Sequence, residues 1–217
     1  SFNKFLIKSI NLDSNSKILD IGCGRGKIIG SLSTKLRLNS RPIGIDIVNH
    51  RDKDLRINFK KIDVITFLAK NKIKFDLVLI KQTIHLLKFN QIKILLTQIK
   101  KSLNQNGKIF ILTLNPHKNE IPNFKLMKNK LLKSFKKDKK ILSHISKLYP
   151  ASVLKNFSYK VKISKKKYIE MISKRYISTI LNLSENQILQ GIDEINLKYK
   201  KNINFYDKLI CIIIKNN

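Results

Sequence analysis

A cluster of glycines at the end of an apolar run constrains the fold more than any other feature of this sequence. Four of the seven glycines fall within residues 17–30, in the stretch KILDIGCGRGKIIG. The apolar run contains Asp20 and leads into Gly22, Gly24 and Gly26, and a helical pattern follows. Glycine permits a tight turn and lets backbone N–H groups approach a ligand closely. The stretch therefore predicts a strand, a ligand-binding loop and a helix in succession.

The spacing of these glycines argues against two common nucleotide-binding motifs. Position 27 is Lys27, so the pattern is GxGxG and differs from the dinucleotide fingerprint GxGxxG. The loop also lacks the GK[ST] ending of a phosphate-binding P-loop. The ligand has to be inferred from other residues.

Short apolar runs alternate with helical patterns through the first half of the chain. Runs typical of buried strands occupy residues 17–21, 42–47, 59–62, 75–80 and 108–114. Residues 27–38 and 89–103 carry apolar side chains at helical spacing. This alternation predicts an α/β fold with a doubly wound, mostly parallel sheet.

The second half is more basic. Residues 118–175 hold 18 cations and 3 acids, mostly in helical patterns, and residues 157–163 and 208–214 alternate like strands. We expect helices at about 165–181 and from Ser184, whose hydroxyl forms a capping box with Gln187. The length suits one domain over residues 1–217, with a cofactor-binding core at 1–115 and an acceptor-side half at 116–217. In that second half we expect a helical lid at about 165–200 and a last strand at 208–214.

Three acids occupy the ends of three successive predicted strands. Asp20 is in the first, Asp46 closes the second, 20 residues after Gly26, and Asp63 ends the third. A carboxylate in the place of Asp46 can accept both hydroxyls of a ribose, and one in the place of Asp63 can accept an adenine amine. Together they describe a pocket for a nucleoside with a cationic tail.

These residues resemble the class I S-adenosylmethionine-dependent methyltransferases. The stretches ILDIGCGRG, GIDI, IDV, FDLVLIKQTIHLL and NGKIFILTL follow the order and distances of that family's motifs over residues 17–115. The resemblance implies a seven-stranded Rossmann-like sheet, S-adenosylmethionine as cofactor and methyltransferase activity. It also implies these cofactor contacts: Asp20, Gly22, Cys23, Gly24, Gly26, Asp46, Ile47, Asp63, Val64 and Lys81.

Candidate acceptor residues follow the fourth predicted strand and occupy the predicted lid. His85 is a candidate catalytic base, although a histidine here also commonly packs under the cofactor or caps the next helix. Residues 168–178 resemble the lid of the small-molecule "type 11" group of methyltransferases. Tyr168 and Met171 also suit the packing face of an amphipathic helix. The candidate acceptor contacts are Gln82, His85, Tyr168, Met171, Arg175 and Tyr176.

The acceptor class is open to alternatives. The tetrad Asn/Asp-Pro-Pro-aromatic, which DNA amino-methyltransferases carry after the fourth strand, is replaced by KQTI at residues 81–84. We expect a small-molecule acceptor, with oxygen favoured over nitrogen. The alternatives are an RNA-binding methyltransferase that uses the basic surface and a non-catalytic cofactor-binding module.

The net charge of +31 suggests a nucleic-acid partner at first sight. The cations are 39 lysines and 6 arginines, however, and the chain is equally skewed to 36 isoleucines over 5 valines, as an AT-rich genome would produce. Because arginine is the residue that binds phosphate and guanine in bidentate fashion, this balance weakens the nucleic-acid hypothesis. Two cysteines without a CxxC motif indicate a reducing compartment and no metal. We expect a cytoplasmic protein with no membrane span.

Overall fold

The computed structural model describes residues 2–216. Within them the chain forms seven strands: β1 (Ile18–Ile21), β2 (Ile43–Asp46), β3 (Asn58–Lys61), β4 (Phe75–Lys81), β5 (Leu103–Leu114), β6 (Val153–Ser164) and β7 (Asn202–Lys215). The α-helices are α1 (Phe2–Ser9), α2 (Lys27–Leu36), α3 (Val64–Lys70), α4 (Phe89–Lys101), α5 (Lys125–Leu148), α6 (Lys165–Ser173) and α7 (Glu185–Lys198). Two short 3-10 helices are η1 (Ile84–Leu86) and η2 (Ser178–Ile180).

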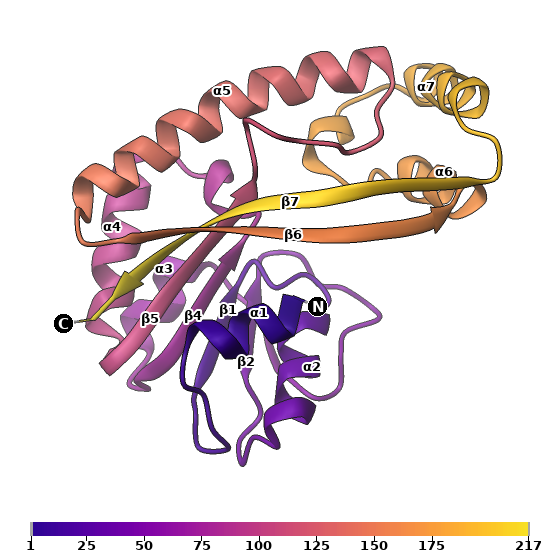
Figure 1. Cartoon of the computed structure of the whole chain (residues 1–217). Coiled ribbons are helices and arrows are strands. Elements are labelled where there is room, and N and C mark those ends of the chain that lie inside the picture. Colours follow the sequence, from indigo (N-terminus) through magenta and orange to yellow (C-terminus); the bar gives the residue numbers. More distant parts are fainter. Residues whose placement is uncertain (1, 217) are drawn as a thin grey trace. The chain divides into compact units, whose positions relative to one another are not determined.

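The strands form one sheet in the order β3-β2-β1-β4-β5-β7-β6. The pairs from β3 to β5 are parallel, and Figure 1 shows β6 and β7 running in opposite directions. The predicted doubly wound, mostly parallel sheet is confirmed. Because β1 lies between β2 and β4, the loops after these three strands emerge at one edge of the sheet, which is where such folds bind ligands.

Helices cover the parallel part of the sheet on both faces. Helices α1 and α2 contact each other, as do α3 and α4, and Figure 1 shows the two pairs on opposite sides of β1 and β4. The strands are therefore apolar on both faces, and β1 has every residue buried, including one acid. Isoleucine and leucine make up most of the core between these layers.

Several boundaries differ from the sequence predictions. Helices α1 and α3 were not expected. Strand β5 begins at Leu103, which pairs with Phe75, and a register shift accommodates the polar residues between Leu103 and Lys108. The helix expected over 165–181 ends at Ser173, because Arg175 adopts a left-handed backbone with φ of 49°. The capping box of Ser184 and Gln187 at the start of α7 is confirmed.

The chain divides into two compact units. Unit 1 comprises residues 2–113, 141–157 and 210–216, and unit 2 comprises residues 114–140 and 158–209. Unit 1 contains β1 to β4, most of β5 and the glycine-rich loop, whereas unit 2 contains α6, α7 and η2. The glycine loop and the three acids at the strand ends therefore all belong to unit 1.

Candidate cofactor and acceptor site

The glycine-rich loop between β1 and α2 has the backbone that its sequence requires. Gly22, Gly24 and Gly26 all have a positive φ, at 70°, 53° and 70°. Residues other than glycine rarely adopt this backbone conformation. The N–H groups of Gly22 and Cys23 both donate to the carbonyl of Ile45, at 2.9 and 3.1 Å. These bonds tie the loop to β2, so the loop is held before any ligand arrives.

Asp46 at the end of β2 holds both the glycine loop and its own turn. Its Oδ2 accepts a hydrogen bond from the N–H of Gly24, and its Oδ1 accepts one from the N–H of Val48, both at 2.9 Å. The side chain is only 14% exposed. Each carboxylate oxygen can accept a second hydrogen bond. Asp46 is therefore oriented as an acceptor for a donor that enters beside the loop.

Asp20 in β1 carries a carboxyl group inside the protein, with the residue 3% exposed. Burial raises the pKa of Asp20 to about 8, with Asp46 adding to the rise and Lys81 opposing it. A buried carboxylate without full compensation is costly, and a cation brought beside it would lower its pKa again. This is the chemistry of a site for a positively charged ligand group.

The residues after β2 and β3 complete the edge of the loop. Ile47 is 69% exposed although it directly follows a buried strand, as a residue that packs on a flat apolar ligand would be. Asp63 caps α3, because its Oδ1 accepts from the N–H groups of Ile65 and Thr66 at 2.9 and 3.1 Å. Val64 is half-buried at the first position of that helix. Asp63 thus has a structural role that was not predicted from the sequence.

The chain that leaves β4 packs directly on the glycine loop. A Cβ placed on Gly22 would lie 2.2 Å from the Oγ1 of Thr83, so Thr83 occupies the space that glycine leaves open. Gln82 beside it has a left-handed backbone with φ of 54°. His85 follows on η1 and is half-buried. The structure therefore brings Gln82 and His85 to the same edge of the sheet as the loop.

Two neighbours of this edge were not predicted from the sequence. Thr83 is a small polar residue whose role depends on its contact with Gly22, and nothing in its local pattern marks it. Phe2 on α1 lies beneath the ammonium of Lys81, which is 5.9 Å from the ring centroid. The apolar spacing of Phe2, Phe5 and Leu6 would have indicated α1.

The thiol of Cys23 does not have the properties of a nucleophile. Its pKa is raised to about 12, by burial first and then by the carboxyl groups of Asp20 and Asp46. Its Sγ instead fills the space beside Gly44, where a Cβ would lie 2.8 Å away. The residue packs the loop against β2.

The candidate acceptor residues of the second half all lie in unit 2. Tyr168 on α6 is 1% exposed, and its hydroxyl donates to the carbonyl of Pro122 and bonds to the hydroxyl of Tyr176 at 2.9 Å. This is the arrangement of a packing residue, so Tyr168 does not line an open pocket here. Arg175 donates to the carbonyl of Leu183 at 3.1 Å.

The other two candidates in unit 2 are more accessible. Met171 is half-buried on α6, and Tyr176 is exposed. Burial of its hydroxyl group nevertheless raises the pKa of Tyr176 to about 12. Because the Tyr168 hydroxyl donates to Pro122, the Tyr176 hydroxyl donates to Tyr168 and keeps its oxygen as an acceptor.

The part of the chain that the structure describes was searched for clusters of metal-binding side chains and for membrane-spanning helices. Residues 2–216 contain no group of three or more His, Cys, Asp or Glu side chains able to hold a metal ion. No helix among them has the length and apolar character needed to cross a bilayer.

Comparisons with known proteins agree with this arrangement. A family model described as a methyltransferase domain matches residues 12–183. No curated protein matches the sequence. Among solved structures, the plantazolicin methyltransferase BpumL in complex with a pentazolic desmethylPZN analog and SAH is 20% identical, with a TM-score of 0.56 over 100% of this chain and 82% of that one.

Two further solved structures share the fold. A SAM-dependent methyltransferase from Archaeoglobus fulgidus is 20% identical, with a TM-score of 0.56 over 99% of this chain and 92% of that one. A phosphoethanolamine N-methyltransferase from Haemonchus contortus is 14% identical, with a TM-score of 0.53 over 100% of this chain and 52% of that one. The family model, the sheet order and the glycine loop lead to one conclusion: this chain belongs to the methyltransferase domain family, as a class I methyltransferase that uses S-adenosylmethionine.

Proposed function

We propose that this methyltransferase transfers the methyl group to a small-molecule acceptor, with oxygen favoured over nitrogen. The observation that carries the proposal is the exit of β4, where Lys81, Gln82, Thr83 and Ile84 stand in place of the tetrad that holds a flipped DNA base. Thr83 packs on Gly22 there, so this segment borders the glycine loop directly.

The residues around the loop fit S-adenosylmethionine by their charge and accessibility. The buried carboxyl of Asp20 would stabilise the cationic methionyl amine, and the pre-oriented carboxylate of Asp46 would accept the ribose hydroxyls. Ile47 would pack on the adenine ring, and Asp63 and Val64 would contact its edge. Asp63 can do this through Oδ2, because the cap of α3 uses Oδ1.

The bound cofactor supplies a methyl group on a positively charged sulfur, which makes that methyl a strong electrophile. The protein then has to orient the acceptor and exclude water. His85 would accept the proton of an acceptor hydroxyl, a role that typically contributes about 10²- to 10⁴-fold to the rate. Gln82, which lies beside Thr83 at the exit of β4, would orient the acceptor by hydrogen bonding.

The four acceptor contacts that the sequence predicts in unit 2 stay part of this proposal. Tyr176 offers a hydroxyl oxygen as acceptor, Met171 an adaptable apolar surface and Arg175 a cation for an anionic group. Tyr168 supports Tyr176 through their hydroxyl contact. We therefore assign Tyr168 a positioning role in this proposal.

The test compares two substitutions. We expect Asp46→Ala to weaken S-adenosylmethionine binding at least tenfold in calorimetry, because it removes a charged acceptor and the bond that holds Gly24. His85→Ala should leave that affinity within about twofold and lower turnover about 10²-fold. Unchanged cofactor affinity in Asp46→Ala would refute the ribose assignment, and unchanged turnover in His85→Ala would refute the base.

The acceptor itself is sought by product mass, with a panel of small hydroxyl, amine and carboxylate compounds offered beside S-adenosylmethionine. The net charge of +31 favours one other candidate, an RNA substrate. Methylated RNA, with binding that weakens steeply between 50 and 200 mM salt, would replace the small-molecule proposal. A methylated small molecule and salt-insensitive turnover would support it.

A further inference from the structure

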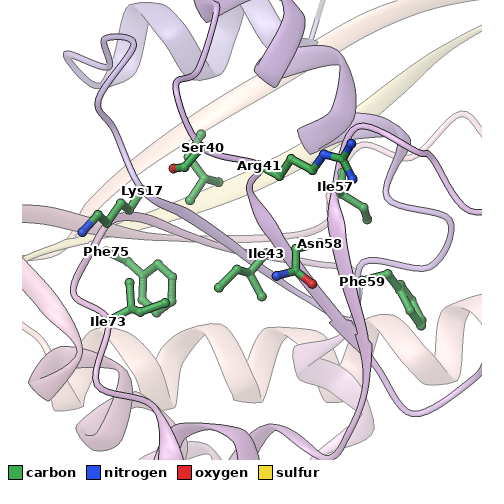
Figure 2. Close-up of a pocket in the computed structure, with 10 residues that line it drawn as sticks. Lys17, Ser40, Arg41, Ile43, Ile57, Asn58, Phe59, Ile73 and Phe75 are labelled. Carbon is green, nitrogen blue, oxygen red and sulfur yellow. The ribbon is translucent and has the colours of Figure 1, made fainter.

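A cavity of about 500 Å³ lies within unit 1 at the opposite edge of the sheet, where the parallel strands begin. Its lining includes Lys17 before β1, Ile43 at the start of β2, Asn58 at the start of β3 and Phe75 at the start of β4. Figure 2 shows Ile43, Asn58 and Phe75 around a common space, with Lys17 at its border. The volume is that of an ordinary small-molecule pocket, and the methyltransferase chemistry proposed above does not use it.

The floor of this amino-edge cavity is apolar. Ile43 and Phe75 are buried core residues, and Ile73 beside Phe75 is 40% exposed at the mouth (Figure 2). Covering the exposed surface of this isoleucine with an apolar ligand would lower the free energy of the system. The floor therefore favours an apolar ligand body.

The rim of the cavity is positively charged. Lys17 and Arg41 lie on either side of Ser40 in Figure 2, and within residues 2–216 neither side chain forms an ion pair or hydrogen bond. The neighbouring acid, Asp76, already accepts the N–H of Lys17 at 2.7 Å and the amide of Asn104 at 2.6 Å. An unpaired guanidinium is suited to a carboxylate, sulfonate or phosphate.

The cavity is separate from the glycine loop. The four residues of β1 stand between Lys17 and the loop, and Ile57 forms a wall on the β3 side. That wall is closed, because a Cβ on Gly26 would lie 2.1 Å from the Cδ1 of Ile57. A ligand in the cavity and a cofactor at the loop can therefore be bound together.

From these features we infer a second ligand site: the amino-edge cavity binds a small anion that carries an apolar body, with Arg41 contacting the anionic group and Ile73 covering the body. This site is independent of the acceptor proposed above. It is defined by unpaired cations over an apolar floor, so the loss of either the cation or the apolar cover should weaken binding.

The probe for this site is 8-anilinonaphthalene-1-sulfonate, an aromatic sulfonate whose fluorescence rises in apolar surroundings. Titration is done in 150 mM NaCl, where long-range attraction by the general positive charge is largely screened. Arg41→Gln removes the anion contact, and Ile73→Glu places a carboxylate at the mouth. We expect each variant to weaken probe binding about tenfold: Arg41→Gln loses one charge-assisted contact, and Ile73→Glu loses the apolar cover and repels the sulfonate.

Two matched variants control for net charge and exposed apolar surface. Arg51→Gln removes one exposed arginine elsewhere in unit 1, and Leu197→Glu adds one acid at a leucine that is 89% exposed. Both should bind the probe within twofold of the parent. Equal weakening in all four variants would show general attraction and overturn the site.

Competition with S-adenosylhomocysteine gives an independent outcome. We expect the probe to remain bound when this product saturates the loop, because Ile57 and β1 separate the two sites. Competitive displacement, with the probe affinity falling in proportion to the product concentration, would place the probe at the glycine loop and overturn the inference.

Discussion

The substitution Asp20→Asn tests whether the buried carboxyl of β1 lowers the stability of the free protein and raises its affinity for the cofactor. Asparagine keeps the shape of the side chain and removes its ionisation. Because burial raises the pKa of Asp20 to about 8 from its ordinary value of 3.8, the folded chain takes up a proton that the unfolded chain releases. A raised acid pKa lowers stability as pH rises from about 4 to about 8.

The magnitude follows from the two pKa values. At pH 7 the carboxyl group is still mostly protonated in the folded chain and ionised in the unfolded chain. The pH interval over which stability is lost is therefore 3.2 units, 7 minus 3.8. One unit corresponds to about 1.4 kcal/mol, so the cost has an upper limit of about 4 kcal/mol. For a chain of this size, Asp20→Asn should raise the melting temperature of the free protein by roughly 10 °C at pH 7. Near pH 4 the two proteins should be equally stable.

Cofactor binding should respond in the opposite sense. If the cationic amine of the cofactor lies beside Asp20, binding expels the proton, so affinity rises about tenfold per pH unit up to about pH 8. Asp20→Asn should bind more weakly and lose this slope between pH 6 and 7.5. Thermal unfolding of both proteins across pH, and calorimetry with S-adenosylhomocysteine in two buffers of different ionisation enthalpy, measure the two effects. A parent affinity that is flat over this range, with no proton released, would refute the reasoning.

Three other substitutions test local packing and capping. Gly30→Ala should destabilise the protein by about 1–3 kcal/mol in urea unfolding, because the new Cβ would lie 2.5 Å from the carboxyl carbon of Asp54. Alanine usually favours a helix over glycine, so a stabilised variant would contradict this close approach of Asp54. Ser184→Ala should cost about 1 kcal/mol through loss of the cap on α7, and an unchanged urea midpoint would show that the cap contributes nothing. Asp63→Asn should keep the stability that Asp63→Ala loses, about 1 kcal/mol, because asparagine also caps helices; equal losses would refute the capping role.

The parallel core was predictable because its signals are local. The glycine loop, the apolar runs and the helical spacing of α4 each follow from a few neighbouring residues, and the strands formed within a few positions of the expected ends. The first residues of β5 were missed because Asn104, Gln105 and Asn106 look like a turn. The strand includes them because Leu103 before them pairs with Phe75 and Lys108 after them pairs with Leu77. Tertiary pairing overrides local preference there.

The second half was less predictable for the same reason. The apolar stripe from Tyr168 to Ile180 continues at helical spacing, but the backbone of Arg175 turns left-handed, and α6 ends at Ser173 instead of continuing to residue 181. No glycine or proline marks this end. The hydrogen bond of the buried Tyr168 hydroxyl was also not predictable from local sequence, because its partner Pro122 lies 46 residues away in the chain.

The three acids at the strand ends show how environment divides one residue type into different roles. Asp20 is buried, which raises its pKa to about 8, Asp46 is held by two backbone N–H groups, and Asp63 caps a helix at an exposed position. Sequence spacing predicts that all three meet at one edge, because parallel strands end together. It does not predict their burial or hydrogen bonds, and these properties determine the pKa of each carboxyl group. Because burial raises the pKa of Asp20, the pH dependence of cofactor binding should be removed by Asp20→Asn and retained when Asp63 is replaced.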